Sequence, residues 1–284
     1  MRLRSIPGKI IQLRRCPRAF WRPFLAGWFF RGQNQTVPCV VPGCGRLLHV
    51  PLQDFYDSYT VVCENSTGRD ELDFFLKQLR PNEVFYDLGA YRGAFAAAVK
   101  MRLGDRAAVH VFDPIPGNIA AIRRICELNG FGGVKINQQA VGRGNVLAGN
   151  VSNFDYMFRA TPSQTGAAPT DAPGTRTDRV EYATLSLDDY VARGETPPTL
   201  MKIDVEGFEW DVLQGGRAVL SSHHPRLWLE VHPEFLENQG QSAAAVLNLL
   251  REIGYTVNFH HDYQSSATKA PYHVWCHRPG PGAP

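Results

Sequence analysis

The stretch VFYDLGAYRG, residues 84–93, decides the fold. An apolar run typical of a buried strand ends near Asp87, and glycines follow at positions 89 and 93, before a series of strong helix formers. A strand, a glycine turn and a helix in this order typically open a nucleotide-binding α/β domain. The turn does not match the dinucleotide fingerprint G-x-G-x-x-G, because Tyr91 occupies the position of the middle glycine, and the sequence contains no P-loop motif.

The acid that precedes the turn indicates the kind of ligand. Asp87 disfavours a pyrophosphate and favours a cation. S-adenosylmethionine fits, because it carries adenosine, a sulfonium and an ammonium but no phosphate. Asp113 supports this hypothesis, since it ends the second predicted strand twenty residues after Gly93, where a carboxylate can accept hydrogen bonds from both ribose hydroxyls. The simpler alternative is a glycine turn that serves packing alone.

Hydrophobic periodicity after Pro81 alternates between strands and helices. The last two predicted strands have no helix between them, which indicates a closing antiparallel hairpin. The pattern as a whole is typical of a doubly wound α/β sheet, in which ligands bind at the carboxyl ends of the strands. The predicted strands are 84–89, 108–113, 134–141, 199–206, 226–232, 255–260 and 272–277, and the predicted helices are 94–103, 117–130, 208–220 and 243–253.

Three regions follow from the pattern. Residues 1–32 form a basic N-terminal arm, residues 33–80 a small cap with a lead-in helix at 70–79, and residues 81–284 the α/β domain. Within that domain, residues 161–178 are rich in Pro, Gly, Ala and Thr. This composition predicts a flexible loop, which is either a lid over a site or a tolerated insertion.

The net charge of +3 is unevenly distributed. The arm holds eight Lys and Arg and no acid, so the rest of the chain carries 22 basic against 27 acidic residues. That balance disfavours nucleic-acid binding. The arm suits a docked helix with solvated arginines, a peripheral contact with an anionic membrane, or a targeting peptide. Its apolar run is too short to span a bilayer, and we expect a cytoplasmic protein with reduced cysteines.

Six stretches, in the same order, resemble the FkbM family of S-adenosylmethionine-dependent methyltransferases. The resemblance covers most of residues 80–235, and it implies the class I methyltransferase fold, a Rossmann-like seven-stranded sheet whose last strand is antiparallel. Tyr91 stands where the family usually has asparagine, and Asp113 where it usually has glutamate. The matching stretches are VFYDLGAYRG (84–93), VHVFDPIPGN (109–118), QAVG (139–142), TLSLDDY (184–190), LMKIDVEGFEWDVLQGG (200–216) and LWLEVHP (227–233).

The resemblance to class I enzymes also implies a cofactor site. The residues of the glycine turn would hold the methionine part, the acid after the second strand would hold the ribose, and residues after the third strand would lie near the adenine. A further acid after the fourth strand would face the path of the methyl group. In this order, the predicted cofactor residues are Asp87, Gly89, Ala90 and Gly93; Asp113, Pro114 and Asn118; Gln139 and Ala140; and Asp204.

A hydroxyl acceptor must lose its proton, so a general base is expected. His232 is the first candidate, because the ordinary pKa of histidine suits proton removal near neutrality. Asp204, Glu206 and Glu230 are alternatives. His232 could instead cap the turn before Pro233, and Glu206 could instead bind the backbone of the following loop.

Strand alternation places Lys202 on the same face as Asp204, which predicts a structural ion pair. No metal site is expected, although a magnesium-assisted mechanism with Asp204 as a ligand stays open. A zinc site is conceivable only in the predicted cap, with Cys39, Cys44, His49 and Cys63 as donors.

The predicted function is methylation of a hydroxyl group on a small-molecule or glycan acceptor, such as a sugar or a natural product, with S-adenosylmethionine as the donor. Two alternatives remain. One is a nitrogen or carboxyl acceptor, and the other is a membrane-docked or partner-binding protein that keeps the fold without catalysis.

Overall fold

The computed structural model describes residues 36–59, 66–151, 158–159, 178–260 and 269–278. The predicted basic arm, residues 1–32, lies outside the described residues, as does the predicted flexible loop apart from Asp178. Cys63, one of the four donors of the zinc hypothesis, also lies outside them.

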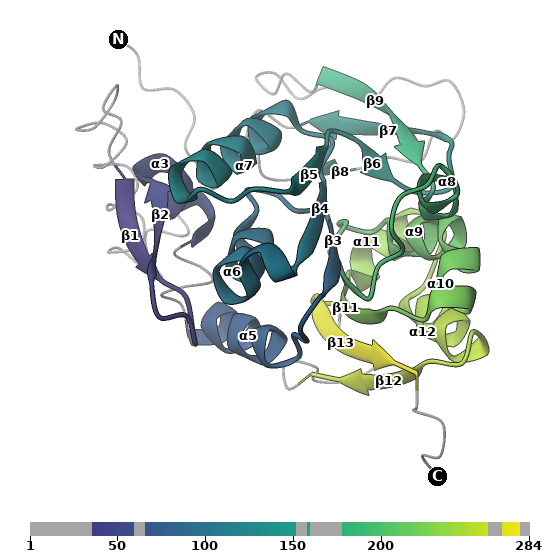
Figure 1. The fold of residues 1–284 in the computed structure, drawn as a ribbon. Coiled ribbons are helices and arrows are strands. Elements are labelled where there is room, and N and C mark those ends of the chain that lie inside the picture. The colour runs from purple at the N-terminus through teal and green to yellow at the C-terminus, as the bar shows by residue number, and fades with distance from the viewer. Residues whose placement is uncertain (1–35, 60–65, 152–157, 160–177, 261–268, 279–284) are drawn as a thin grey trace.

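A seven-stranded sheet forms the centre of the molecule (Figure 1). Its strand order is β12–β13–β11–β10–β3–β4–β5, and β13 runs antiparallel to both of its neighbours while the other pairs are parallel. This order confirms the predicted class I methyltransferase sheet and its closing hairpin. The strands are β3 Val84–Leu88, β4 Ala108–Phe112, β5 Val134–Asn137, β10 Leu200–Ile203, β11 Arg226–Val231, β12 Thr256–Phe259 and β13 Tyr272–His277.

Helices cover both faces of this sheet (Figure 1). Each face has its own apolar core, one around Phe75, Phe95 and Ile122, the other around Tyr86, Leu213 and Leu250. The helices of the first face are α5 Ser66–Lys77, α6 Ala94–Leu103 and α7 Pro116–Asn129, and those of the second are α8 Leu187–Ala192, α9 Glu209–Gly215, α10 Arg217–His223, α11 Pro233–Asn238 and α12 Ala243–Glu252.

The helix predicted over 208–220 is divided into α9 and α10 at Gly216. A Cβ atom at Gly216 would lie 2.8 Å from Leu187 Cδ1, so α8 packs directly against the break. Helices α8 and α11 were not predicted, and they are only six residues long each. Helices this short carry too little periodicity to be detected from hydrophobic spacing.

The strand predicted over 134–141 was wrong in its extent. Only β5, residues 134–137, joins the central sheet, and the chain then leaves it through the exposed pair Gln138 and Gln139. Ala140–Val141 forms β6 of a second sheet, with the order β6–β9–β7–β8. Its other strands are β7 Val146–Val151, β8 Phe158–Arg159 and β9 Asp178–Leu185, which flank the predicted loop.

The N-terminal cap packs beside the glycine turn. It contains the antiparallel strands β1 Thr36–Val40 and β2 Leu47–Pro51, followed by the helical turns α3 Leu52–Asp54 and η1 Phe55–Tyr59. Asp54 is fully buried and forms ion pairs with Arg92 of the turn and with Arg124 of α7. The Tyr59 hydroxyl also donates to the carbonyl oxygen of Arg92, at 3.2 Å. These contacts tie the cap to the turn.

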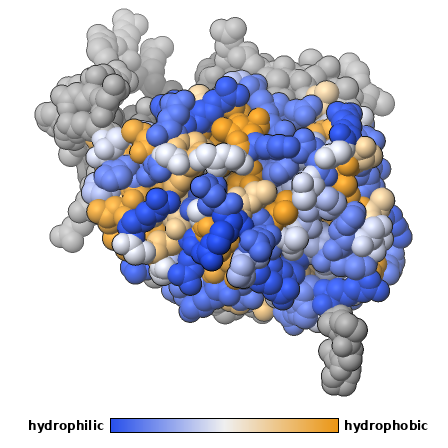
Figure 2. All heavy atoms as spheres, in the orientation of Figure 1, coloured by the Kyte–Doolittle hydropathy of each residue, from blue (hydrophilic) through white to orange (hydrophobic). Residues whose placement is uncertain are grey.

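On the face shown in Figure 2, apolar residues lie in small groups among hydrophilic ones. Large exposed apolar side chains include Val40, Leu47, Leu128 and Phe259. Within the described residues, no helix combines the length and the apolar character needed to cross a bilayer.

Candidate active site

The predicted site residues gather at the carboxyl ends of β3, β4, β10 and β11, which lie close together in the central sheet. Asp87 lies in β3, Asp113 directly follows β4, and Asp204 directly follows β10. Glu230 lies in β11, and His232 comes directly after that strand. The site therefore occupies the edge at which ligands bind in open α/β sheets.

The glycine turn after β3 is held between two neighbouring strands. Gly89 has φ +74°, and a Cβ atom there would lie only 1.8 Å from the backbone oxygen of Asp204. The N–H groups of Gly89 and Ala90 both donate to the Phe112 carbonyl oxygen, at 3.0 and 3.1 Å. A glycine is thus required at position 89 because the turn approaches the backbone after β10 too closely for a side chain.

Gly93 has a different role in the same turn. Its φ is +78°, and a Cβ atom would lie 2.9 Å from Ile122 Cγ1, so this glycine lets α7 pack against the start of α6. Tyr91 also has a positive φ, +50°, which is uncommon for a residue with a bulky side chain. Its N–H donates to Asp113 Oδ2, at 2.9 Å. The turn is therefore joined to the acid after β4.

Asp87 is a buried carboxylate with spare acceptor capacity. Its Oδ2 accepts a hydrogen bond from Ala96 N at 3.2 Å, whereas its buried Oδ1 has no hydrogen-bond partner in the described part of the chain. Burial raises the pKa of Asp87 to about 6, although the positive charge of Lys202 opposes this effect. An unpaired buried oxygen of this kind is suited to a cationic ligand.

Asp113 is also buried, but its oxygens are already engaged. Oδ1 accepts from Ile115 N at 2.9 Å and from Asn118 Nδ2 at 3.0 Å, and Oδ2 accepts from Tyr91 N. Burial raises the pKa of Asp113 to about 6 against these bonds. The side chain of Asn118 is buried and holds Asp113 in place. Oδ2 retains acceptor capacity, because a carboxylate oxygen can accept two hydrogen bonds and Oδ2 accepts only the one from Tyr91 N.

The remaining predicted cofactor residues lie near the end of β5 or after β4. Pro114 and Ala140 are half-buried, and Gln139 is exposed. Their contacts with an adenosine stay predictions.

Lys202 forms the predicted ion pair. Its Nζ lies 2.9 Å from Asp204 Oδ2, and the strand register places it opposite Asp87 of β3. Burial alone would lower the pKa of Lys202, but the charges of Asp204 and Asp87 outweigh burial and raise it. Lys202 is therefore a permanent cation that stabilises the two carboxylates beside it.

His232 lies among four carboxylates. Its Nδ1 is 2.8 Å from Glu209 Oε1, and its Nε2 faces Glu206 Oε2 at 3.5 Å, Glu230 Oε1 at 3.7 Å and Asp204 Oδ1 at 3.9 Å. The ring also stacks on Phe235. The structure thus brings together all four predicted catalytic residues, His232, Asp204, Glu206 and Glu230.

Glu209 is a residue that sequence reasoning missed. It is 0% exposed, and its Oε1 accepts hydrogen bonds both from His232 and from Gly207 N, the latter at 3.0 Å. The loop backbone is therefore bound by Glu209, the role that the alternative interpretation gave to Glu206. His232 does precede α11, but its side chain makes no capping hydrogen bond there. Its ring is directed to Glu209 instead.

The electrostatics of this cluster differ from the expectation for His232. Burial alone would lower its pKa, but Glu209, Glu230 and Asp204 outweigh burial and raise the pKa to about 9. The premise that His232 keeps an ordinary histidine pKa was therefore wrong. Burial raises the pKa of Glu206 to about 7, with the charge of His232 opposing it. An imidazolium thus lies at the centre of the acids at neutral pH.

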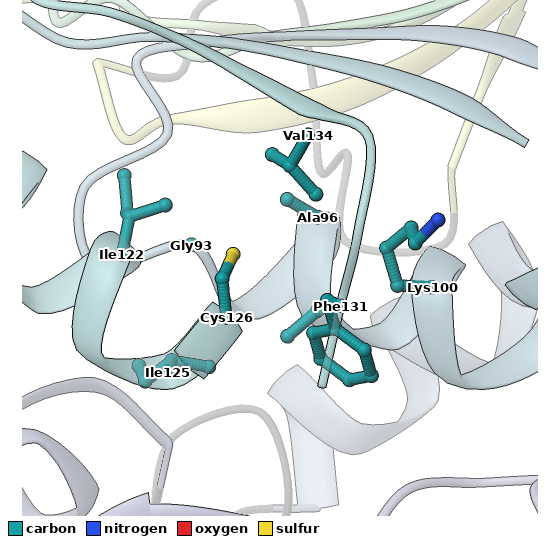
Figure 3. Close-up of a pocket in the computed structure, with 9 residues that line it drawn as sticks. Gly93, Ala96, Lys100, Ile122, Ile125, Cys126, Phe131 and Val134 are labelled. Carbon is teal, nitrogen blue, oxygen red and sulfur yellow. The ribbon is translucent and has the colours of Figure 1, made fainter. Parts of the chain in front are cut away.

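A separate small pocket lies behind the glycine turn (Figure 3). It is lined by Gly93, Ile122, Phe131 and other apolar side chains, together with Lys100. The Lys100 ammonium is paired with Asp105 at 3.3 Å. The residues that line the pocket include no carboxylate that could bind a sulfonium or a ribose, so we place the candidate site at the strand ends instead.

Comparisons with known proteins identify a family for the chain. The sequence model of the methyltransferase FkbM domain matches residues 87–257, more than half of the chain, and this range contains every predicted site residue. A curated relative, Methyltransferase 1 of Beauveria bassiana, is 27% identical over 226 residues, which cover 71% of this chain and 87% of that protein.

Two solved structures are also similar. Methyltransferase FkbM from Methylobacillus flagellatus is 15% identical, with a TM-score of 0.45, and the alignment covers 94% of this chain but only 60% of that chain. Precorrin-6y C5,15-methyltransferase from Geobacter metallireducens is 11% identical, with a TM-score of 0.44 and coverage of 75% and 88%.

Proposed function

Because the chain belongs to the FkbM methyltransferase family, we propose that it methylates a hydroxyl group of a sugar or natural-product acceptor, with S-adenosylmethionine as the donor. The observation that carries the proposal is that carboxylate side chains form two groups at the ends of neighbouring strands. One group, Asp87 and Asp113, flanks the glycine turn, and the other surrounds His232 beside it. The first group suits the positively charged donor S-adenosylmethionine. The second group can supply the carboxylate that accepts the proton of the acceptor hydroxyl.

The residues of the turn fit the proposed cofactor. S-adenosylmethionine supplies an electrophilic methyl group on a positively charged sulfur. The buried, unpaired Oδ1 of Asp87 offers an acceptor to a cationic group, and the fixed carboxylate of Asp113 offers acceptor capacity to a ribose. The glycine turn that these residues flank matches neither the dinucleotide fingerprint nor the P-loop, which supports a donor without phosphate.

Within the second group, Glu206 is the most accessible carboxylate. Its side chain is 40% exposed, compared with 26% for Asp204 and 22% for Glu230. Glu206 is thus the group that an acceptor entering from solvent reaches first, and we assign it the role of general base. His232, held by Glu209, lies between these carboxylates and fixes their arrangement. The site then aligns the acceptor oxygen with the donor, which is the main contribution that a methyltransferase site makes.

Two measurements test the proposal. Isothermal calorimetry with S-adenosylhomocysteine should detect binding to the wild type and a loss of at least tenfold in Asp113→Ala. Incubation with donor carrying a trideuterated methyl group and a panel of hydroxylated sugars and natural products should yield one acceptor with the corresponding mass shift. Fragmentation then distinguishes oxygen from nitrogen or carboxyl methylation. No binding of S-adenosylhomocysteine to the wild type would reject the proposal.

A further inference from the structure

We propose that Asp204, Glu230 and His232 bind one divalent metal ion of the manganese or magnesium class, next to the proposed cofactor site. This differs from the expectation drawn from the sequence, which did not favour a metal site. The three residues come from the ends of the neighbouring strands β10 and β11. Each offers one ligand atom, and these atoms all lie within 4.8 Å of one another.

The spacing of the ligand atoms fits a shared ion. His232 Nε2 lies 3.9 Å from Asp204 Oδ1 and 3.7 Å from Glu230 Oε1. These separations are too long for hydrogen bonds. Two ligand atoms that are both about 2.1 Å from one ion are about 3–4 Å apart, depending on the angle between them. Both separations from His232 Nε2 fall within this range.

A second observation concerns the surroundings of the His232 Nε2 atom. The His232 side chain is only 4% exposed, and its Nε2 has ion-pair contacts with the carboxylates, the shortest 3.5 Å to Glu206 Oε2, but no hydrogen bond with any described residue. Its Nδ1 is held by the buried Glu209. Histidines that bind metals usually donate their other ring nitrogen to a carboxylate in this way, which fixes the ring and the tautomer. The arrangement presents Nε2 as a ligand.

The two carboxylates are also held from outside. Asp204 Oδ2 is 2.9 Å from Lys202 Nζ, and Glu230 Oε2 is 3.4 Å from His273 Nε2. In each case the outer oxygen meets a basic side chain, and the other oxygen faces His232. Outer partners of this kind orient metal-binding carboxylates. Two carboxylates and one imidazole suit a cation of the manganese or magnesium class better than a thiolate-seeking one.

The competing interpretation is that the proton on His232 Nε2 alone balances the acids. A metal ion would displace this proton and release it to solvent. The other proton would stay on Nδ1, in the hydrogen bond to Glu209. A bound ion would also make a coordinated acceptor hydroxyl more acidic. That catalytic role rests on the proposed function, whereas the binding of the ion does not.

The experiment uses the full chain after chelation and removal of the chelator. Mn²⁺ is titrated, and both calorimetry and the loss of the free Mn²⁺ electron paramagnetic resonance signal are recorded. We expect one ion per chain. Asp204→Asn, Glu230→Gln and His232→Asn should each weaken binding at least tenfold, whereas Glu127→Gln, an exposed acid on α7, should leave it unchanged. Mg²⁺ should compete with Mn²⁺ for the same site.

A spectroscopic measurement distinguishes the loss of a metal ligand from unfolding of the variant. Pulsed electron paramagnetic resonance of the bound Mn²⁺ should show a coupled ¹⁴N nucleus that disappears in His232→Asn, and circular dichroism should show that the variant is folded. The proposal is overturned if Mn²⁺ does not bind, or if it binds equally well to all three variants. Binding of S-adenosylhomocysteine without binding of Mn²⁺ would remove the metal site and leave the proposed function standing. Binding of Mn²⁺ without binding of S-adenosylhomocysteine would reject the proposed function and leave the metal site standing.

Discussion

Glu209 and His232 are joined by a hydrogen bond of 2.8 Å between Oε1 and Nδ1, and this bond directs the opposite ring nitrogen into a group of three carboxylates. The two residues are far apart in the chain and lie on different elements, since Glu209 begins α9 and His232 follows β11. The pair therefore connects the loop after β10 with the end of β11, and it sets the geometry of the whole cluster.

Removal of the Glu209 carboxylate should destabilise the protein. Glu209→Ala leaves the Gly207 N–H and the His232 Nδ1 without their buried acceptor, and we expect a loss of about 2–4 kcal/mol in the free energy of unfolding. Glu209→Gln should lose less, because its amide oxygen can still accept from Gly207. Urea denaturation of both variants measures the difference. Equal stability of wild type and Glu209→Ala would contradict the assigned contacts.

Asp87→Asn should stabilise the protein without ligand while weakening cofactor binding. The pKa of Asp87 is raised from 3.8 to about 6 in the fold, so the carboxylate, although ionised at pH 7.5, is less stable in the folded than in the unfolded state. Asparagine removes this penalty and can still accept from Ala96 N, which predicts a gain of about 1–3 kcal/mol at pH 7.5. Because a raised carboxyl pKa lowers stability only as pH rises, the gain should shrink at pH 5. Denaturation at both pH values measures it.

The same substitution separates stability from binding. We expect the affinity for S-adenosylmethionine to fall at least tenfold in Asp87→Asn, because a buried negative charge that faces the cation is lost. Calorimetry at pH 7.5 provides the measurement. A stabilised variant that binds the cofactor as tightly as the wild type would show that Asp87 serves the fold alone.

Cofactor affinity should also depend on pH. Burial raises the pKa values of Asp87 and Asp113 to about 6, so both carboxyls are mainly ionised at pH 7.5 and mainly protonated at pH 5.5. Acidification therefore removes negative charge from the site, and the affinity for the cationic donor should fall about threefold to tenfold. Calorimetric titrations at the two pH values test this. An unchanged dissociation constant would mean that neither carboxylate contacts the donor.

Gly89→Ala should destabilise the protein far more than the same substitution at a glycine with open space around it. Its Cβ would lie 1.8 Å from the Asp204 carbonyl oxygen, so the turn must move away from β10, and we expect a loss of about 3 kcal/mol or more. Gly130→Ala is the matched control, because Gly130 has φ +65° but a Cβ atom there would meet no described atom within 4 Å. That change should cost about 1 kcal/mol. Similar losses in thermal denaturation would refute the close approach.

Much of the fold could be predicted from the sequence, because the strands of the central sheet are buried apolar runs with clear boundaries. The position of Asp113 after β4 and the pairing of Lys202 with Asp204 followed from strand ends and from alternation, which are local properties. The second sheet was not predicted, since its strands flank a segment without an apolar period and one of them, β6, has only two residues.

The part of the site that was missed depends on long-range contacts. Glu209 carries no signal in its own neighbourhood that distinguishes it from a solvated acid in the first turn of a helix. Its importance appears only when β11 brings His232 beside it. The raised pKa of His232 has the same origin, because it comes from acids on three different segments of the chain.

The attachment of the cap to the turn has a consequence for making chimaeric proteins. Asp54 supplies a buried countercharge to Arg92, and Arg92 lies between Tyr91 and Gly93. A chain shortened past Asp54 would leave a guanidinium without this carboxylate inside the protein, in the glycine turn. Exchange of the segment that precedes α5 with that of a relative should therefore cost the least stability when the donor segment brings an acid that can take the place of Asp54 beside Arg92.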